Sequence, residues 1–447
     1  MSEFTLIITA AAGISLLLFL VIRTKLHAFV SLLLVSLLVG IAAGLPLDEV
    51  IQSIQKGMGE TLGFVAIVVG LGAMFGQILE ISGGAERLAQ TFMKKFGQDK
   101  VPWALGVTGF LVGIPVFFDV GFIVLVPIVY RLAKKTGRSL LYYGIPLFAG
   151  LSVSHSFIPP TPGPIIVANL IGADLGWVIL FGIIAGLPAM VVAGPLFGKY
   201  IANYIHVTVP DYMTIEEMED DQGLPSFGLI ITIILVPLAL ILLNTLSSVL
   251  LPEENIIRSV CEFLGHPFVA LLITTLLVFY FLGIKHGFSK QEVQLIASKS
   301  LEPAGMIILI TGAGGIFKQV LMDTGVGNVL ADSMANSPLP PIVLAFLIAT
   351  IIRIAQGSAT VAMVTSASLI SPLITTLGLT GPILGLMVIS IAAGSTIASH
   401  VNDSGFWLIN RYLGLDVKET LRSWTVMETI ISLIGFAIVF FISLLIA

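Results

Sequence analysis

The chain has 447 residues, of which 57% are hydrophobic and only 11% are charged. A soluble domain carries about a quarter charged residues, so this composition excludes an ordinary soluble protein. The net charge of -5 says little about partners, because lipid hides most of the surface, and we expect no nucleic-acid partner. The single cysteine, Cys261, excludes an internal disulfide framework and a cysteine-based metal site. Apolar runs of about 20 residues recur from end to end, whereas a β-barrel would alternate. We therefore predict an all-α polytopic membrane protein.

The first half of the chain begins with three predicted spans and then departs from simple crossings. The spans are expected at Phe4–Ile22, Leu26–Gly44 and Thr61–Ile81. The next apolar stretch, about residues 103–133, is too long for one crossing of a bilayer of ~30 Å. Its centre, GIPVFFDVGF, carries Gly113 and Pro115, which break a helix. We predict a re-entrant helical hairpin here, with Asp119 at its tip.

Another interrupted stretch follows, and then a charged connector. Residues 140–171 are again apolar and overlong, and the segment SHSFIPPTPGP predicts a broken helix there. A span at Leu175–Tyr200 closes what we interpret as a first repeat, residues 1–200. The acidic run in residues 201–225 is expected to be a solvated linker.

Residues 226–447 repeat this plan. The expected elements are spans Phe227–Leu250, Pro267–Gly283 and Pro303–Met322, a hairpin at about 339–377 broken at RIAQGSAT, a broken helix at about 381–413 broken at STIASHVNDSG, and a last span Thr425–Ile446. The repeat also extends to residues, because the dipeptide Ser154-His155 corresponds to Ser399-His400. Lys318 lies within the expected span Pro303–Met322, and the sequence pattern suggests no role for it.

The basic residues predict an orientation for the two repeats. If each hairpin re-enters, each half has five crossings, and an odd number makes the second repeat inverted relative to the first. With both termini outside, most of the 21 Lys and Arg lie in the cytoplasm, as the positive-inside rule requires. The acidic linker is then cytoplasmic, the first hairpin enters from the cytoplasm, and the second enters from outside. The expected location is the cell inner (plasma) membrane.

The four helix breaks predict a transport site. Unpaired backbone inside a bilayer is costly unless protein or a water-filled cavity satisfies it, and inverted repeats with broken helices are how secondary transporters build binding sites. The N–H groups at half-helix N-termini attract anions. The candidate substrate-binding residues at these breaks are Ser154, His155, Thr161, Arg353, Gly357, Ser358, Thr360, Ser399, His400 and Asn402.

Ionisable residues within a membrane are usually paired or functional. The guanidinium fork of Arg353 suits a substrate carboxylate or the hairpin tip, and pairing with a structural acid fits equally well. We interpret His155 and His400 as neutral, hydrogen-bonded residues of the site lining, with a proton relay as the alternative. Asp119 and Asp403 are the candidates for proton coupling, because removal from water favours a neutral carboxyl group. A helix cap or a cation ligand are the alternatives for Asp119.

The residues at the breaks also carry a resemblance. The stretches GIPVFFDVGFIVLVPI, GLSVSHSFIPPTPGPI, RIAQGSATVAMVT and GSTIASHVNDSGFW resemble the gluconate permease family, the gluconate:H+ symporters, and the resemblance covers essentially the whole chain. More distantly, the chain resembles the ion transporter superfamily, whose members have two re-entrant hairpins and two broken helices. Hairpin tips in that superfamily contain a serine-asparagine-threonine motif; QGSAT matches it only partly and FFDVG replaces it, which favours protons over sodium.

The resemblance implies a homodimer with a scaffold domain and an elevator-like transport domain, and a small hydroxylated monocarboxylate as substrate, most often gluconate. We therefore expect a secondary active transporter that couples gluconate uptake to protons and uses no cofactor or metal. The alternatives are another small acid (D-serine, a ketogluconate or a dicarboxylate), sodium coupling, a channel, or an intramembrane enzyme. No H-E-x-x-H motif supports an enzyme.

Overall fold

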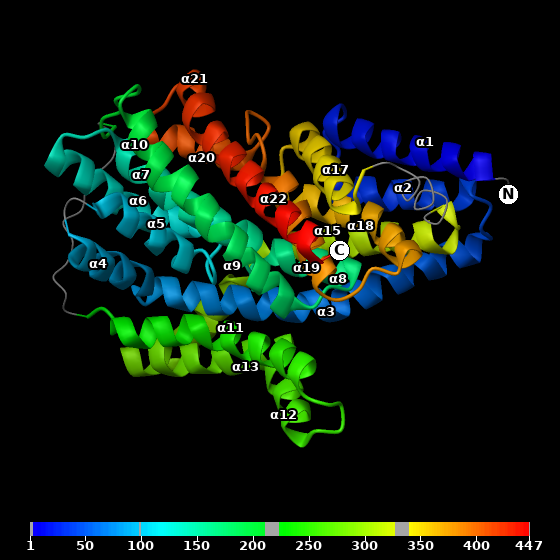
Figure 1. Cartoon of the computed structure of the whole chain (residues 1–447), viewed down its shortest axis with the longest axis horizontal. Helices are drawn as coiled ribbons and strands as arrows, with labels where there is room; N and C mark the ends of the chain where they lie inside the picture. Colours follow the sequence, from blue (N-terminus) through cyan, green and yellow to red (C-terminus); the bar gives the residue numbers. More distant parts are fainter. Residues whose placement is uncertain (1–2, 98–99, 211–222, 327–338, 447) are drawn as a thin grey trace.

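The computed structural model describes residues 3–97, 100–210, 223–326 and 339–446. Within these ranges the chain is helical and contains no strand (Figure 1). Seven helical segments among these residues are long and apolar enough to cross a membrane. The prediction of an all-α polytopic membrane protein is confirmed. The acidic core of the predicted linker, residues 216–221, lies outside the described residues.

The first half contains three long helices, a pair of helices at each predicted break, and a closing segment. These are α1 (Glu3–Ile22), α2 (Ala28–Ala42), α3 (Leu47–Ile81), α4 (Gly84–Phe96), α5 (Val101–Val112), α6 (Phe118–Thr136), α7 (Leu140–Phe157), α8 (Pro162–Ile171), α9 (Leu175–Val191), the π-helical turn η2 (Val192–Leu196) and α10 (Phe197–Ala202). The third span is longer than expected, since α3 begins at Leu47 rather than Thr61.

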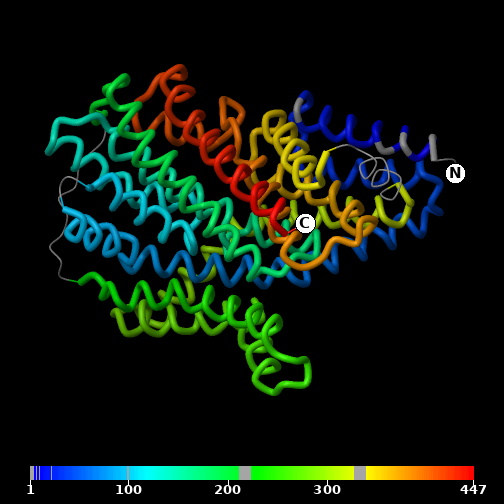
Figure 2. Tube along the Cα trace, in the orientation of Figure 1, coloured from blue at the N-terminus to red at the C-terminus, as the bar shows by residue number. Residues whose placement is uncertain are grey.

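The second half follows the same order with a few short additions. Its helices are α11 (Phe227–Leu250), α12 (Ile256–Gly265), α13 (Pro267–Val278), η3 (Phe279–Gly283), η4 (Ile284–His286), α14 (Lys290–Lys299), α15 (Leu301–Asp323), α17 (Pro341–Gln356), α18 (Ala359–Leu377), α19 (Pro382–Thr396), α20 (Ser404–Leu413), α21 (Val417–Thr420), η5 (Leu421–Thr425) and α22 (Val426–Ile446). Figure 2 follows this course along the Cα trace.

Local chemistry explains where the two hairpins turn. Helix α5 ends at Gly113, and Pro115 cannot continue it because it has no N–H to donate. In the second hairpin, Gly357 adopts the left-handed conformation with φ of 84° and ends α17. Ser358 then caps α18 by accepting a hydrogen bond from the backbone N–H of Val361.

The two broken helices are interrupted by equally specific residues. Residues 158–161, which include Pro159 and Pro160, separate α7 from α8. Residues 397–403 separate α19 from α20, and Ala398 takes a positive φ of 49° there. Asp403 restarts the helix by accepting a hydrogen bond from the backbone N–H of Gly405.

Helices α3 and α15 pack against each other at the centre of the molecule. The contact is close because both carry glycine where they meet: a Cβ added to Gly57 would lie 2.6 Å from the carbonyl oxygen of Gly315. The contacts also link the two halves, since α2 packs on α15 and α13 packs on α3. In Figure 1 the helices α1 and α2 lie at one end of the long axis, whereas α11 and α13 lie along the lower side of the molecule.

The interrupted helices form the rest of the core. The first hairpin packs on the first broken helix through α5 and α7, and the second hairpin does the same through α17 and α19. Helices α9 and α22 close this group by packing on each other and on α19. The arms α5 and α6 contact α4, whereas α17 contacts α1, so the two hairpins approach the core from different ends (Figure 1).

The structure assigns a partner to Lys318. Its Nζ donates a hydrogen bond of 2.7 Å to the carbonyl oxygen of Leu170, which also accepts a bond of 2.9 Å from the hydroxyl of Ser371. Leu170 lies in the last turn of α8, where carbonyl groups have no partner within the helix and attract a cation. Lys318 therefore ties the end of α8 to α15.

We expect Lys318→Met to destabilise the folded protein by about 1–3 kcal/mol, because it leaves a buried carbonyl group without its charged donor. The measurement is the midpoint of thermal unfolding of the purified protein in detergent. Lys290→Met is the control, since Lys290 is exposed at the start of α14. Equal midpoints for the two variants would contradict this role.

Candidate substrate site

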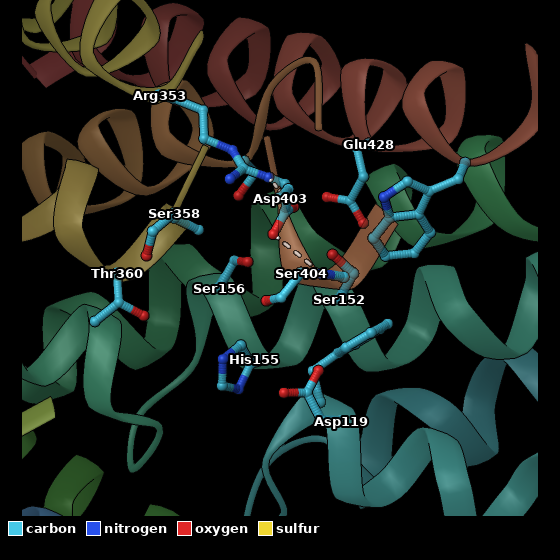
Figure 3. Close-up of a pocket in the computed structure, with 15 residues that line it drawn as sticks. Asp119, Ser152, His155, Ser156, Arg353, Ser358, Thr360, Asp403, Ser404 and Glu428 are labelled. Carbon is cyan, nitrogen blue, oxygen red and sulfur yellow. Dashed lines mark hydrogen bonds and ion pairs between the residues drawn. The ribbon is translucent and has the colours of Figure 1, made fainter. Parts of the chain in front are cut away.

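A cavity of about 160 Å³ lies where the two hairpins, the two broken helices and α22 meet (Figure 3). It is lined by Phe118, Asp119, Ser152, His155, Ser156, Arg353, Ser358, Ala359, Thr360, Thr396, Asp403, Ser404, Gly405, Trp424 and Glu428. Pockets for drug-sized ligands measure about 300–1,000 Å³, so this volume suits a small solute. Most of the lining groups are hydroxyl or charged groups, which predicts a polar ligand.

Helix ends give the cavity a directional field. Helices α6, α18 and α20 all begin there, with Asp119, Thr360 and Ser404 in or next to their first turns. The first N–H groups of a helix have no partner within it, and the helix dipole places positive charge at that end. Three N-termini around one small cavity create a site that favours an anion.

Arg353 is the only arginine of the cavity lining, and its side chain is 3% exposed. Its Nη2 pairs with Oδ2 of Asp403 at 2.5 Å, and its Nη1 donates to the carbonyl oxygen of Gly357. Its Nε has no hydrogen-bond partner among the described residues. One N–H of the guanidinium group is therefore free for a further acceptor.

A chain of hydrogen bonds from η5 positions Asp403. The indole Nε1 of Trp424 donates to the hydroxyl of Ser399 at 2.7 Å, and that hydroxyl donates to Oδ2 of Asp403. The hydroxyl of Thr425 donates to the carbonyl oxygen of Ser399. With Arg353 and the N–H of Gly405 also donating to it, Asp403 is well satisfied as a charged carboxylate.

Two further titratable groups face the cavity from the first half. Asp119 lies in the first turn of α6 and is exposed within the cavity wall. His155 lies in the last turn of α7, its ring is packed edge-on against Phe117, and its Nδ1 has no partner among the described residues. Figure 3 shows both side chains on the side of the cavity opposite Arg353.

The cavity brings together six of the residues predicted from sequence: Asp119, His155, Arg353, Ser358, Thr360 and Asp403. Gly357 borders it as the residue whose carbonyl group binds Arg353. Ser399 does not line the cavity, but its hydroxyl donates a hydrogen bond to Asp403, which does. Which of these residues contacts substrate stays a prediction.

The other four predicted residues lie outside the cavity lining. Ser154 and Thr161 donate to backbone carbonyl groups of their own segments, Gly150 and Ile158. The Nε2 of His400 and the Nδ2 of Asn402 lie 3.1 and 3.0 Å from the carbonyl oxygen of Ile354, in the last turn of α17. In this structure these side chains satisfy helix ends near the site.

Sequence reasoning missed several residues of the lining, above all Glu428. This carboxylic acid lies in α22 and is 3% exposed. A signal was present in the sequence, because Glu428 is the only charged residue of the last apolar span and such residues are usually functional. Ser152 and Ser156, two residues on either side of Ser154, were missed as well.

The helical bundle, its four interrupted helices and the small charged cavity at their junction define a multi-pass membrane transporter. Among the described residues, no group of three or more His, Cys, Asp or Glu side chains could hold a metal ion. The chain belongs to the GntP permease family, since the model of the GntP family permease matches residues 4–445.

Characterised relatives agree with this assignment. The chain is 42% identical to the low-affinity gluconate transporter of Escherichia coli K12 over 435 residues, which is 97% of each protein. It is 41% identical to the Gnt-II system L-idonate transporter of the same strain, covering 96% of this chain and 97% of the relative. The gluconate permease of Bacillus subtilis is 40% identical, with 98% and 100% covered. The prediction of a transporter rather than an enzyme is confirmed.

The fold is also similar to a solved structure. The YdaH transporter of Alcanivorax borkumensis, described as having an unusual topology, superimposes with a TM-score of 0.67 and 15% sequence identity. The match covers 92% of this chain and 97% of the other. The two chains therefore share a fold.

Proposed function

We propose that this protein takes up gluconate, or a related small hydroxylated monocarboxylate, together with protons. The observation that carries the proposal is Arg353, which lines a small hydroxyl-lined cavity at three helix N-termini and whose buried Nε has no hydrogen-bond partner among the described residues. A carboxylate that accepts from this N–H and from the start of α18 would lie beside Ser358 and Thr360. Several relatives of this chain are named gluconate transporters or permeases.

The rest of the cavity suits the other end of such a molecule. Each carbon of a sugar acid beyond the carboxylate carries a hydroxyl group that both donates and accepts hydrogen bonds. The hydroxyl groups of Ser152, Ser156 and Ser404 line the wall away from Ser358 and can do the same. This complementarity favours a polyhydroxylated acid such as gluconate over D-serine, which carries a single hydroxyl group.

Charge in the cavity supports coupling to protons. Asp119, Asp403 and Glu428 face one guanidinium group, and an incoming substrate adds a fourth carboxylate. Like charges in a desolvated site disfavour one another strongly, so at least one carboxyl group must take up a proton when the anion binds. Asp119 and Asp403 are the coupling residues predicted from the sequence.

We further propose an elevator-like mechanism in a homodimer of the plasma membrane. Residues 1–200 and 226–447 would be inverted repeats, with both chain termini outside and the linker of residues 201–225 in the cytoplasm. Support comes from the repeated order of helices and from the interrupted helices that surround the cavity. Helices α3 and α15, which cross outside the hairpins, would belong to the scaffold.

The test is uptake of radiolabelled gluconate by proteoliposomes. An imposed difference of ~1 pH unit, alkaline inside, should drive about tenfold accumulation at one proton per substrate. Sodium should have no effect, and D-serine, ketogluconate and dicarboxylates should compete less well than unlabelled gluconate. Gluconate exchange without accumulation in the pH gradient would reject proton coupling. Failure to transport gluconate while another acid of the panel is transported would reject the substrate.

A further inference from the structure

Glu428 stands apart from the other acids of the cavity by its position on α22. It follows Trp424 of η5 by about one helical turn, so η5 and α22 together present both side chains to the same wall of the cavity. Figure 3 shows its carboxyl group directed toward the space beside Asp403. Its Oε1 is buried and has no hydrogen-bond partner among the described residues.

The three carboxyl groups of the cavity differ in what surrounds them. Asp403 accepts hydrogen bonds from Arg353, Ser399 and the N–H of Gly405. Asp119 lies in the first turn of α6, and its side chain is exposed where that of Glu428 is 3% exposed. Glu428 has the Ser152 hydroxyl and the charge of Arg353 as neighbours, but it is buried and its Oε1 has no hydrogen-bond partner among the described residues. Burial therefore makes a charge at Glu428 costly.

The charged and titratable groups around Glu428 come from four elements. Arg353 belongs to α17, Asp403 to the break before α20, Asp119 to α6 and His155 to α7. Helices α9 and α19, which also pack on α22, carry no titratable side chain. Arg353 already pairs with Asp403, so a charged Glu428 has to share that guanidinium group with Asp403.

We propose that Glu428 carries the coupled proton. This inference rests on the proposed function and assigns its proton to one residue. With substrate bound, a neutral Glu428 lets the anion share the cavity with Asp119 and the Arg353–Asp403 pair. After the substrate leaves on the cytoplasmic side, Arg353 is available to a charged Glu428, which releases its proton there. Glu428 is thereby neutral when the substrate anion is bound and charged when the cavity is empty.

The experiment separates coupling from transport in proteoliposomes. Gluconate exchange needs no net proton movement, whereas accumulation in a pH gradient does. For Glu428→Gln we expect accumulation to fall from about tenfold to about onefold, while exchange of internal unlabelled for external labelled gluconate stays measurable. Glu428→Asp, which keeps an acid, should restore part of the accumulation. Glu80→Gln is the matched control, because Glu80 bonds to Gln77 on α3 and lies outside the cavity lining.

Labelling of the unaltered protein gives an independent measurement that does not depend on how the variants fold. A hydrophobic carbodiimide reacts with protonated carboxyl groups in apolar surroundings, and mass spectrometry locates the product. We expect modification at Glu428 and protection by gluconate.

Three outcomes would overturn the proposal. Glu428→Gln could accumulate gluconate fully, or Asp119→Asn could lose accumulation while Glu428→Gln keeps it. The third outcome is labelling at Asp119 in place of Glu428. Loss of exchange together with accumulation in a folded Glu428→Gln protein would also overturn it, because Glu428 would then be needed for binding. Failure of the unaltered protein to accumulate gluconate would instead overturn the proposed function.

Discussion

Gluconate uptake should fall by about 100-fold when Arg353 is replaced by alanine, because truncating one partner of a buried ion pair costs about 2–5 kcal/mol. The variant removes the free Nε that we assign to the substrate carboxylate, and it leaves Asp403 in the cavity without its cation. The measurement is the initial rate of radiolabelled gluconate uptake by proteoliposomes in a pH gradient. Arg353→Lys should restore little, since an ammonium group cannot reproduce the fork that bonds Asp403 and Gly357 together.

Two further variants distinguish binding from folding. Arg258→Ala is the matched control, because Arg258 also pairs with an acid, Glu262, but in a half-exposed pair whose energy is about 0–1 kcal/mol. The double variant Arg353→Ala/Asp403→Ala removes both charges, so its thermal stability should exceed that of Arg353→Ala alone. Its gluconate uptake should remain absent. Uptake by this double variant at the rate of the unaltered protein would show that Arg353 acts only as a partner of Asp403.

The interruptions of the helices could be predicted from the sequence because they are local. Glycine and proline disfavour a continuing helix, so GIPVFFDVGF and RIAQGSAT, in the middle of overlong apolar stretches, marked the turns of both hairpins. The length of the apolar runs then excluded a simple crossing. For the same reason, residues at the breaks, such as Arg353 and Thr360, were predicted to gather at one site, and they line the cavity.

The residues that could not be predicted depend on tertiary packing or on which side of a helix faces inward. Trp424 and Glu428 reach the cavity because η5, which leads into α22, packs beside the break of residues 397–403, a contact between residues 25 positions apart. On α7 nearly every side chain is buried, so the sequence has no polar face that would distinguish Ser152 and Ser156 from Ser154. Ser154 turned out to bond its own helix.

Gly357→Ala tests whether uptake requires close contact between the tip of the second hairpin and the second broken helix. Its φ of 84° disfavours any side chain, and an added Cβ would lie 2.3 Å from the backbone oxygen of Asn402. Relieving this clash must separate α17 from residues 397–403 and so pull Arg353 away from Asp403. We expect gluconate uptake to fall by about 30-fold or more, since the ion pair is lost in part.

Gly137→Ala supplies the control that separates backbone strain from this packing effect. Gly137 ends α6 as Gly357 ends α17, with a left-handed φ of 68°, but nothing lies within 4 Å of the Cβ that alanine would add. Both variants carry the strain of a positive φ, about 1–2 kcal/mol, and both should unfold at a lower temperature. Only Gly357→Ala should lose uptake, because only its methyl group would clash with the backbone of Asn402 in the second broken helix. Equal uptake by the two variants would mean that this contact can open without disturbing the arginine.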